Sequence, residues 1–187
     1  MPGAALRHGL AIVGGIALGV ASAWWAIGRL PDGERYGAWR SDPLTGSTAA
    51  DAYTRARSAR HGLLALNREE ALYLIAAQDD GGAPLSERCD YEIRGGTLPA
   101  AWWSLTVYAA DEFLPRNGSA AYAIDAAHLR RDGDGRWRAR LATTREASAN
   151  WLDSTATGTP SLTLRLYRPK AALRADALPT ITRRSCR

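Results

Sequence analysis

Six side chains with ligand-binding groups occupy alternating positions in two β-forming stretches of this sequence. They are Trp102, Ser104, Thr106 and Tyr108 in the first stretch, and Arg165 and Tyr167 in the second. Because successive side chains alternate across a strand, each set is expected on one face of its strand. Aromatic rings, hydroxyls and an arginine suit a sugar, a lipid head group or a carboxylate. The simpler interpretation is a solvated or helix-covered face with paired side chains, and the sequence does not place the two strands side by side.

Catalytic signatures are absent from the sequence. There is no nucleophile elbow, zinc-protease motif, Walker loop or dinucleotide fingerprint, and the three histidines (His8, His61 and His128) are far apart. Asp111 and Glu112 follow the first stretch and could act as a carboxylate pair, although a solvated loop is the simpler interpretation. Asp132 and Asp134 occupy a turn that lacks the closing glutamate of a calcium loop. We therefore expect no metal and no cofactor.

The two cysteines, Cys89 and Cys186, lie near the ends of the β-rich region. No Cys-x-x-Cys motif is present, so a metal or redox site is not indicated. The simpler interpretation is two lone buried thiols. In an exported domain we expect a disulfide, which would join the last strand, Thr180–Cys186, to the sheet.

Short runs of alternating apolar and polar residues, separated by turn residues, predict a mainly β domain over residues 50–187 with a β-sandwich or jelly-roll arrangement. The predicted strands are Leu72–Asp79, Tyr91–Arg94, Trp102–Tyr108, Ala121–Ile124, Arg136–Thr143, Leu162–Arg168 and Thr180–Cys186. Within the third of these strands, Trp103, Leu105 and Val107 share the face expected to enter the core.

A helix is predicted over Ala50–Leu66, ahead of the strands. Its apolar stripe at helical spacing consists of Ala52, Ala56, Ala59, Leu63 and Leu66. Three arginines, Arg55, Arg57 and Arg60, lie off that stripe, on a face expected to meet solvent or lipid head groups. Residues 30–49, which are rich in turn residues, are expected to form a linker.

Residues 1–29 are expected to be a membrane anchor or a signal peptide. Gly9–Ile27 carries no charge, and nineteen helical residues span about 28 Å, close to the ~30 Å hydrocarbon core. Signal peptidase could cut after Ala23, but the apolar run continues beyond it, which favours a retained anchor. The small residues Gly15 and Gly19 would permit weak self-association of this helix.

The sequence contains opposing signals for the side of the membrane on which the C-terminal domain lies. More arginines follow the apolar run than precede it, which favours a cytoplasmic domain. The order of the N-terminal segments, the possible cleavage site and the cysteine pair favour export. We expect a single-pass protein of the bacterial inner membrane, in contact with its lipid, with the C-terminal domain in the periplasm.

The net charge of +5 does not indicate a nucleic-acid partner. Of the 24 basic residues only Lys170 is a lysine, and the arginines are scattered rather than clustered with aromatic residues. An alanine- and arginine-rich composition of this kind is typical of a GC-rich genome, and we expect no nucleic-acid binding.

Three segments resemble the bacterial domain-of-unknown-function family 1214 in order and spacing: Ala101–Tyr108, Asn150–Leu152 and Leu162–Pro169. The likeness covers roughly Glu69 to Ile181 and includes the turn at Asp132–Gly135. It implies a sandwich-like β domain and a partner, because members are often fused to or paired with a family 1254 domain, which this chain replaces with a membrane segment. It implies no catalytic residues.

These expectations together predict a binding or interaction module of the cell envelope. The alternatives are an envelope hydrolase that uses Asp111, Glu112 or an arginine, and a structural subunit of a complex with a family 1254 protein.

Overall fold

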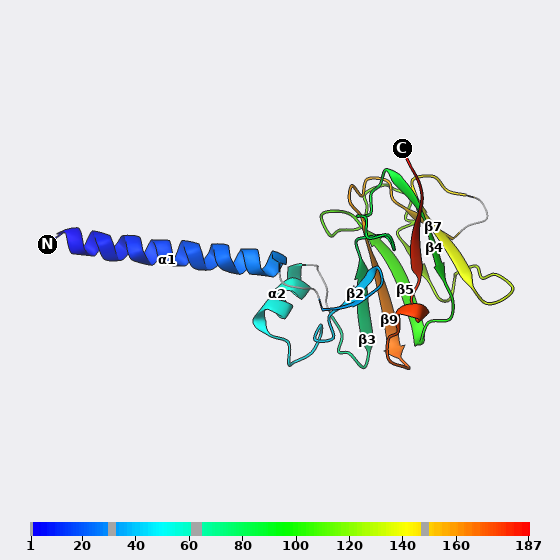
Figure 1. The fold of residues 1–187 in the computed structure, drawn as a ribbon, viewed down its shortest axis with the longest axis horizontal. Helices are drawn as coiled ribbons and strands as arrows, with labels where there is room; N and C mark the ends of the chain where they lie inside the picture. Colours follow the sequence, from blue (N-terminus) through cyan, green and yellow to red (C-terminus); the bar gives the residue numbers. More distant parts are fainter. Residues whose placement is uncertain (1, 30–32, 61–64, 147–149) are drawn as a thin grey trace.

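The computed structural model describes residues 2–29, 33–60, 65–146 and 150–187. A long helix, α1 (Pro2–Arg29), projects from a domain built of two β-sheets, and a short helix, α2 (Ala52–Arg60), lies where the two meet (Figure 1). The prediction of a mainly β chain with two N-terminal helices is confirmed.

One sheet has six strands in the order β1-β2-β3-β9-β5-β6, with neighbouring strands antiparallel. The strands are β1 (Glu34–Tyr36), β2 (Trp39–Ser41), β3 (Ala71–Ala76), β9 (Ser161–Pro169), β5 (Ala100–Tyr108) and β6 (Ala123–Asp125). The other sheet has the order β10-β4-β7-β8, and its last pair is parallel. Its strands are β10 (Thr180–Cys186), β4 (Cys89–Gly95), β7 (Trp137–Ala142) and β8 (Asn150–Asp153).

The inner faces of both sheets contribute to one hydrophobic core. On β5, Trp103, Leu105 and Val107 are buried as their alternation predicts. The Trp103 ring stacks on that of Trp137 from β7, with the centroids 5.1 Å apart. These aromatic residues join the two sheets at the centre of the domain.

β4 and β5 are consecutive strands but belong to different sheets. The chain crosses between the sheets at Gly95–Pro99, next to the Trp137 ring. A side chain at Gly95 would collide with that ring, and Trp137 Nε1 donates a 3.0 Å hydrogen bond to Gly96 O. The Gly-Gly pair therefore permits close packing at the crossing.

The segment expected to be a linker, residues 30–49, contains the short strands β1 and β2. Arg40 of β2 pairs with Ile75 of β3, so this part of the chain extends the six-stranded sheet. The prediction of a turn-rich linker did not include these two strands. The hydrophobic pattern did not reveal these strands because each has three residues.

The apolar stripe predicted for the first helix of the domain is also wrong in its described part. α2 begins at Ala52 and is described to Arg60, and Ala52 and Ala59 are exposed. The buried residue of α2 is Thr54, and Leu66 lies outside the helix. Residues 61–64, where the stripe was expected to continue, lie outside the described residues.

The disulfide expected between Cys89 and Cys186 is present, and it joins directly opposed positions of β4 and β10. The other end of β10 is held by the turn that follows β3. There, Asp80 Oδ2 accepts a hydrogen bond from Ile181 N, and Asp79 pairs with the Arg183 guanidinium at 3.0 Å. The last strand is therefore fixed at both ends.

Within the described residues, α1 is one helix that is long and apolar enough to cross a membrane, over Gly3–Gly28. Length and composition of this kind also fit a signal sequence. The helix continues without a break through the possible cleavage site at Ala23. Trp24 and Trp25, near its C-terminal end, are exposed.

Candidate functional site

The outer face of the six-stranded sheet carries the six side chains predicted to form a site. Trp102 lies opposite Tyr167, and Ser104 lies opposite Arg165, so β5 and β9 are adjacent. Directly opposed residues of an antiparallel pair share a sheet face. The pairing therefore brings both predicted sets of side chains together on one surface.

Arg165 is held by its neighbours on this face. Its guanidinium donates to Thr106 Oγ1 at 3.2 Å and to the Tyr108 hydroxyl at 2.6 Å, and it lies 5.6 Å from the centre of the Tyr108 ring. These contacts use two of the five N–H donors. The remaining donors and the fixed orientation suit an anion placed over the sheet.

The aromatic pair lies at one end of the face. The rings of Trp102 and Tyr167 have centroids 5.2 Å apart and are inclined at 51°. Trp102 is 39% exposed, whereas Thr106 on the same face is buried. Only part of the predicted face is therefore open to a ligand.

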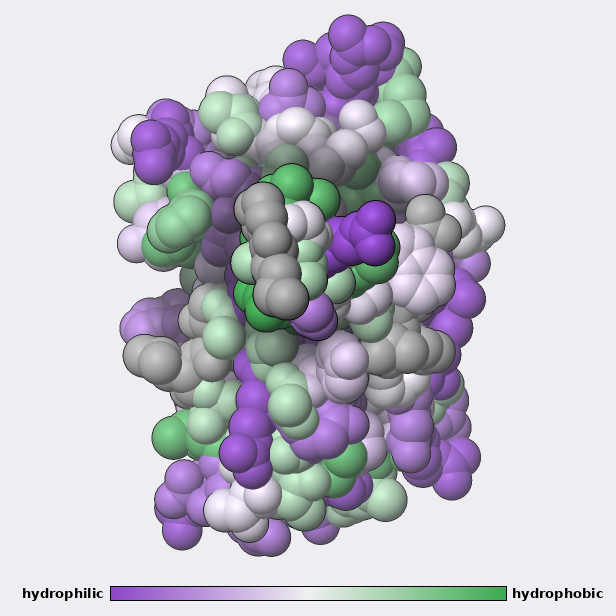
Figure 2. Space-filling model, turned by 90° about the vertical axis from the view of Figure 1, so that its left-hand side faces the viewer, coloured by the Kyte–Doolittle hydropathy of each residue, from purple (hydrophilic) through white to green (hydrophobic). Residues whose placement is uncertain are grey.

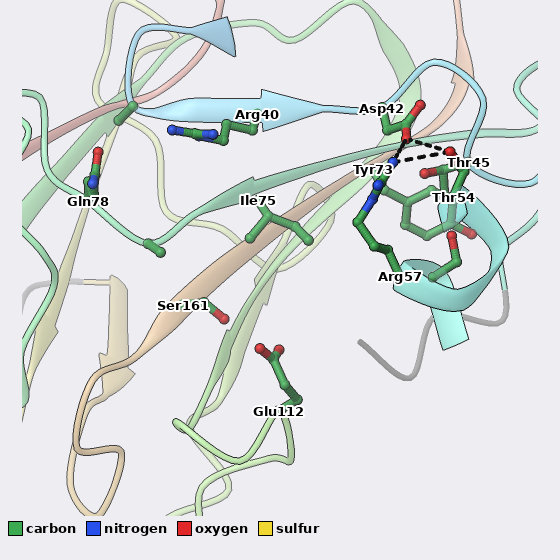
Figure 3. Close-up of a pocket in the computed structure, with 13 residues that line it drawn as sticks. Arg40, Asp42, Thr45, Thr54, Arg57, Tyr73, Ile75, Gln78, Glu112 and Ser161 are labelled. Carbon is green, nitrogen blue, oxygen red and sulfur yellow. Dashed lines mark hydrogen bonds and ion pairs between the residues drawn. The ribbon is translucent and has the colours of Figure 1, made fainter. Parts of the chain in front are cut away.

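A cavity of about 270 Å³ opens on the same sheet face, over β2 and β3 (Figure 3). Its lining is mostly apolar in area, with polar groups from β2, α2 and the loop after β5. The lining residues are Ala38, Arg40, Asp42, Thr45, Thr54, Arg57, Ser58, Tyr73, Ile75, Ala77, Gln78, Glu112 and Ser161.

The floor of the cavity continues directly into the predicted face. Tyr73 and Ile75 of β3 lie opposite Arg165 and Thr163 of β9, and Ser161 lies opposite Tyr108. The cavity and the predicted face are therefore neighbouring parts of one surface.

α2 forms one wall of the cavity and is held there by two aspartates. Asp51 caps the helix, since its Oδ1 accepts a 2.7 Å hydrogen bond from Thr54 N, and this bond holds the pKa of Asp51 below its usual value. Asp42 Oδ2 accepts from Thr54 Oγ1 at 3.5 Å and from Arg57 Nη2 at 3.4 Å. The wall is fixed by charge-assisted contacts instead of the apolar stripe that the sequence predicted.

Arg40 reaches the cavity from β2, on the side away from α2 (Figure 3). Its side chain is exposed. In the part of the chain that the structure describes, its guanidinium makes no hydrogen bond and no ion pair. This arginine is therefore a cation available to a bound anion.

Glu112 approaches the cavity from the loop after β5 and adopts φ 65°. This left-handed conformation is uncommon for a residue with a side chain and is a form of strain often found at functional sites. Asp111 does not line the cavity, and its Oδ1 accepts a hydrogen bond from Phe113 N in its own loop. The predicted carboxylate pair therefore does not meet in this cavity.

Sequence reasoning missed most of the cavity. Arg40 and Asp42 lie in the segment expected to be a linker, and Arg57 was placed on a solvent- or lipid-facing surface. Tyr73 and Ile75 belong to a predicted strand whose place in the sheet was not predictable from local pattern.

Among the described residues, no group of three or more His, Cys, Asp or Glu side chains is placed to hold a metal ion.

Comparisons with known proteins define a family and a fold. The family described as "Protein of unknown function (DUF1214)" matches residues 70–171. The crystal structure of the VPA0106 protein from Vibrio parahaemolyticus is similar with a TM-score of 0.61 at 18% identity, over 91% of this chain and 44% of that one. An uncharacterized protein from Burkholderia cenocepacia has a TM-score of 0.49 at 19% identity, over 62% of this chain and 30% of that one.

A search of the curated proteins finds no match. The chain spans less than half the length of either solved structure. The Vibrio structure supports the fold, and at this identity it carries no information about activity.

Proposed function

The chain belongs to the DUF1214 family of proteins of unknown function, and from this premise and the geometry of the cavity we propose that it is a membrane-anchored binding module of the bacterial cell envelope. In this proposal α1 crosses the inner membrane once and the β domain lies in the periplasm. The length and apolar composition of Gly3–Gly28 support the anchor. The Cys89–Cys186 disulfide supports the oxidising side of the membrane.

The observation that carries the binding role is Arg40 at a mostly apolar cavity, without a partner among the described residues. Ligand pockets are typically apolar with a few placed polar groups, although this one is slightly smaller than the usual range of about 300–1,000 Å³. The lining therefore suits a ligand with an apolar part and one anionic group. A ligand longer than the cavity would continue past Tyr73 toward Arg165.

A second role, as subunit of a complex with a family 1254 protein, has one observation in its favour. The similar Vibrio protein is more than twice as long as the region it shares with this chain. A companion protein would then supply the region that the Vibrio protein carries on the same chain, outside the part it shares with this one. A hydrolase has less support, because Glu112 reaches the cavity without Asp111.

The binding role is tested with phenylbutyrate, which combines an apolar ring with one carboxylate and dissolves in water. The full chain in lipid nanodiscs is titrated by calorimetry, beside empty nanodiscs. We expect saturable binding that Arg40→Gln weakens about 10- to 100-fold, since a hydrogen bond to a charged group contributes ~1.5–3 kcal/mol. Phenylbutanol, which lacks the charge, should bind the unaltered chain correspondingly less tightly.

Arg184→Gln is the matched control, because Arg184 is an exposed arginine on β10 of the other sheet. This variant should bind phenylbutyrate like the unaltered chain. Absence of saturable binding, or equal affinity of the Arg40→Gln variant, would contradict the proposed ligand chemistry.

A further inference from the structure

The C-terminal end of α2 lies against the C-terminal end of α1. The Arg60 guanidinium lies 5.4 Å from the centre of the Trp24 ring, and its Nη1 would be 3.7 Å from a Cβ placed on Gly28. Figure 1 shows α2 at the end of α1, on the side of the domain from which α1 projects. These contacts set the position of α2 relative to the candidate membrane span.

The position of Trp24 gives the depth of this contact if α1 crosses the bilayer. The 26 residues of Gly3–Gly28 extend about 39 Å as a helix, longer than the ~30 Å hydrocarbon core. The last turns of α1 therefore extend into the head-group region, where tryptophan is enriched. Trp24 is 67% exposed, and its contact with Arg60 places that guanidinium at the same level.

The side chains of α2 divide between two directions. Thr54, Arg57 and Ser58 line the cavity. Tyr53 and Arg60 are two turns apart, so they lie on nearly the same side of the helix, and both are exposed. Tyr53 adds a second aromatic residue of the kind found at membrane interfaces.

The charge of this surface complements an anionic membrane. α2 contains three arginines and no acidic residue. Arg57 is paired with Asp42, whereas Arg60 has no carboxylate partner among the residues that the structure describes. Figure 2 views the domain from the α1 side, where hydrophilic and hydrophobic residues are mixed around the helix seen end-on.

We propose that Arg60, in contact with Trp24 and on the same side of α2 as Tyr53, binds the phosphate of anionic phospholipid head groups and seats α2 on the membrane surface. The inference rests on the proposed membrane anchor. Because α2 is also a wall of the cavity, head-group binding would fix the cavity next to the membrane. An amphipathic ligand would then reach the cavity from the bilayer surface.

The test uses hydrogen exchange of the α2 amides, measured by mass spectrometry on the full chain in vesicles. Vesicles of phosphatidylcholine alone are compared with vesicles that also contain phosphatidylglycerol. We expect exchange in α2 to be about fivefold slower with the anionic lipid, the factor that corresponds to ~1 kcal/mol for one basic residue near an anionic surface. The Arg60→Gln variant should lose this dependence on lipid charge, and the Arg184→Gln variant should keep it.

Three results would overturn the inference. Equal exchange in both lipids, with the chain still resistant to alkaline extraction, would refute head-group binding while the anchor stands. Equal slowing by inorganic phosphate with neutral vesicles would show that the site does not require a membrane. Failure of the chain to remain in vesicles after alkaline extraction would refute both the anchor and the inference.

Discussion

Trp102 and Trp103 are adjacent residues with different surroundings. Trp103 is 3% exposed and stacks on Trp137 between the sheets, whereas Trp102 packs against Tyr167 on the outer face and is 39% exposed. The alternation of a β-strand separates the two rings. One tryptophan therefore belongs to the core and the other to the candidate binding surface.

The two tryptophans should differ in their effect on stability. Trp103→Ala should lower the free energy of unfolding by about 3–5 kcal/mol, because it removes buried area and leaves a cavity. Trp102→Ala should lower it by about 1–2 kcal/mol. Denaturant unfolding of both variants measures the difference. Equal large losses would mean that both sheet faces are buried. A larger loss for Trp102 would show that the core face and the outer face are assigned the wrong way round.

Asp51 should make the order of α2 depend on pH. Its pKa is lowered in the folded chain by the hydrogen bond from Thr54 N. The ionised carboxylate therefore stabilises the folded state above its ordinary pKa of about 3.9, and this contribution is lost as the pH falls through the lower folded value.

Two variants of Asp51 check this prediction by hydrogen exchange of α2. Asp51→Ala should speed exchange at neutral pH, and the difference from the unaltered chain should shrink in acid. Asp51→Asn should keep most of the protection, because asparagine is an equally good N-cap. Equally fast exchange in both variants would contradict this explanation. It would show that the charge of Asp51, and not its capping hydrogen bond, holds the wall of the cavity.

At the scale of secondary-structure elements, β10 depends on a covalent link. Cys89 and Cys186 join the strand to β4 across 97 positions of sequence, and Asp80 holds its other end. Reduction should therefore loosen β10 before the rest of the sheet.

Cys186→Ser should lower the free energy of unfolding by about 2–5 kcal/mol. Intact-mass measurement of the denatured, unreduced chain with a thiol alkylator checks the link itself. We expect no alkyl adduct. Two adducts would show that the thiols are free.

Apart from the three-residue strand β6, the strands that sequence reasoning identified have six or more residues. β3, β5, β7 and β9 fall close to the predicted ranges because their apolar positions meet the core with a period of two. The strands of β1 and β2 are too short for that signal. β8 carries the Asn150–Leu152 motif, but its parallel pairing with β7 has no local signature.

The candidate site was predictable only in part for a similar reason. Alternation identified the outer faces of β5 and β9, but their adjacency depends on pairing across more than fifty residues. The cavity adds Arg40 from β2 and Arg57 from α2, which the register of β2 on β3 and the Asp42 contacts bring together. Such long-range placement is not contained in a local pattern.

At the scale of the whole molecule, α1, α2 and the cavity follow one another along one direction in space. α1 ends at Arg29, α2 touches α1 at Trp24, and α2 also lines the cavity over β2 and β3 (Figures 1 and 3). If α1 is a membrane anchor, the candidate site lies beside the bilayer surface. The account therefore depends most on whether the anchor is retained and on which side the domain lies.

Fractionation of cells that express the full chain tests both the retention of the anchor and the side of the membrane on which the domain lies. Membranes are washed with alkali, the N-terminus of the retained protein is determined, and intact spheroplasts are treated with protease from the periplasmic side. We predict that the chain stays in the washed membranes with its N-terminal segment intact, and that the protease degrades the domain. Release into the wash, or an N-terminus at Trp24, would contradict the anchor, and protection from the protease would contradict the periplasmic placement.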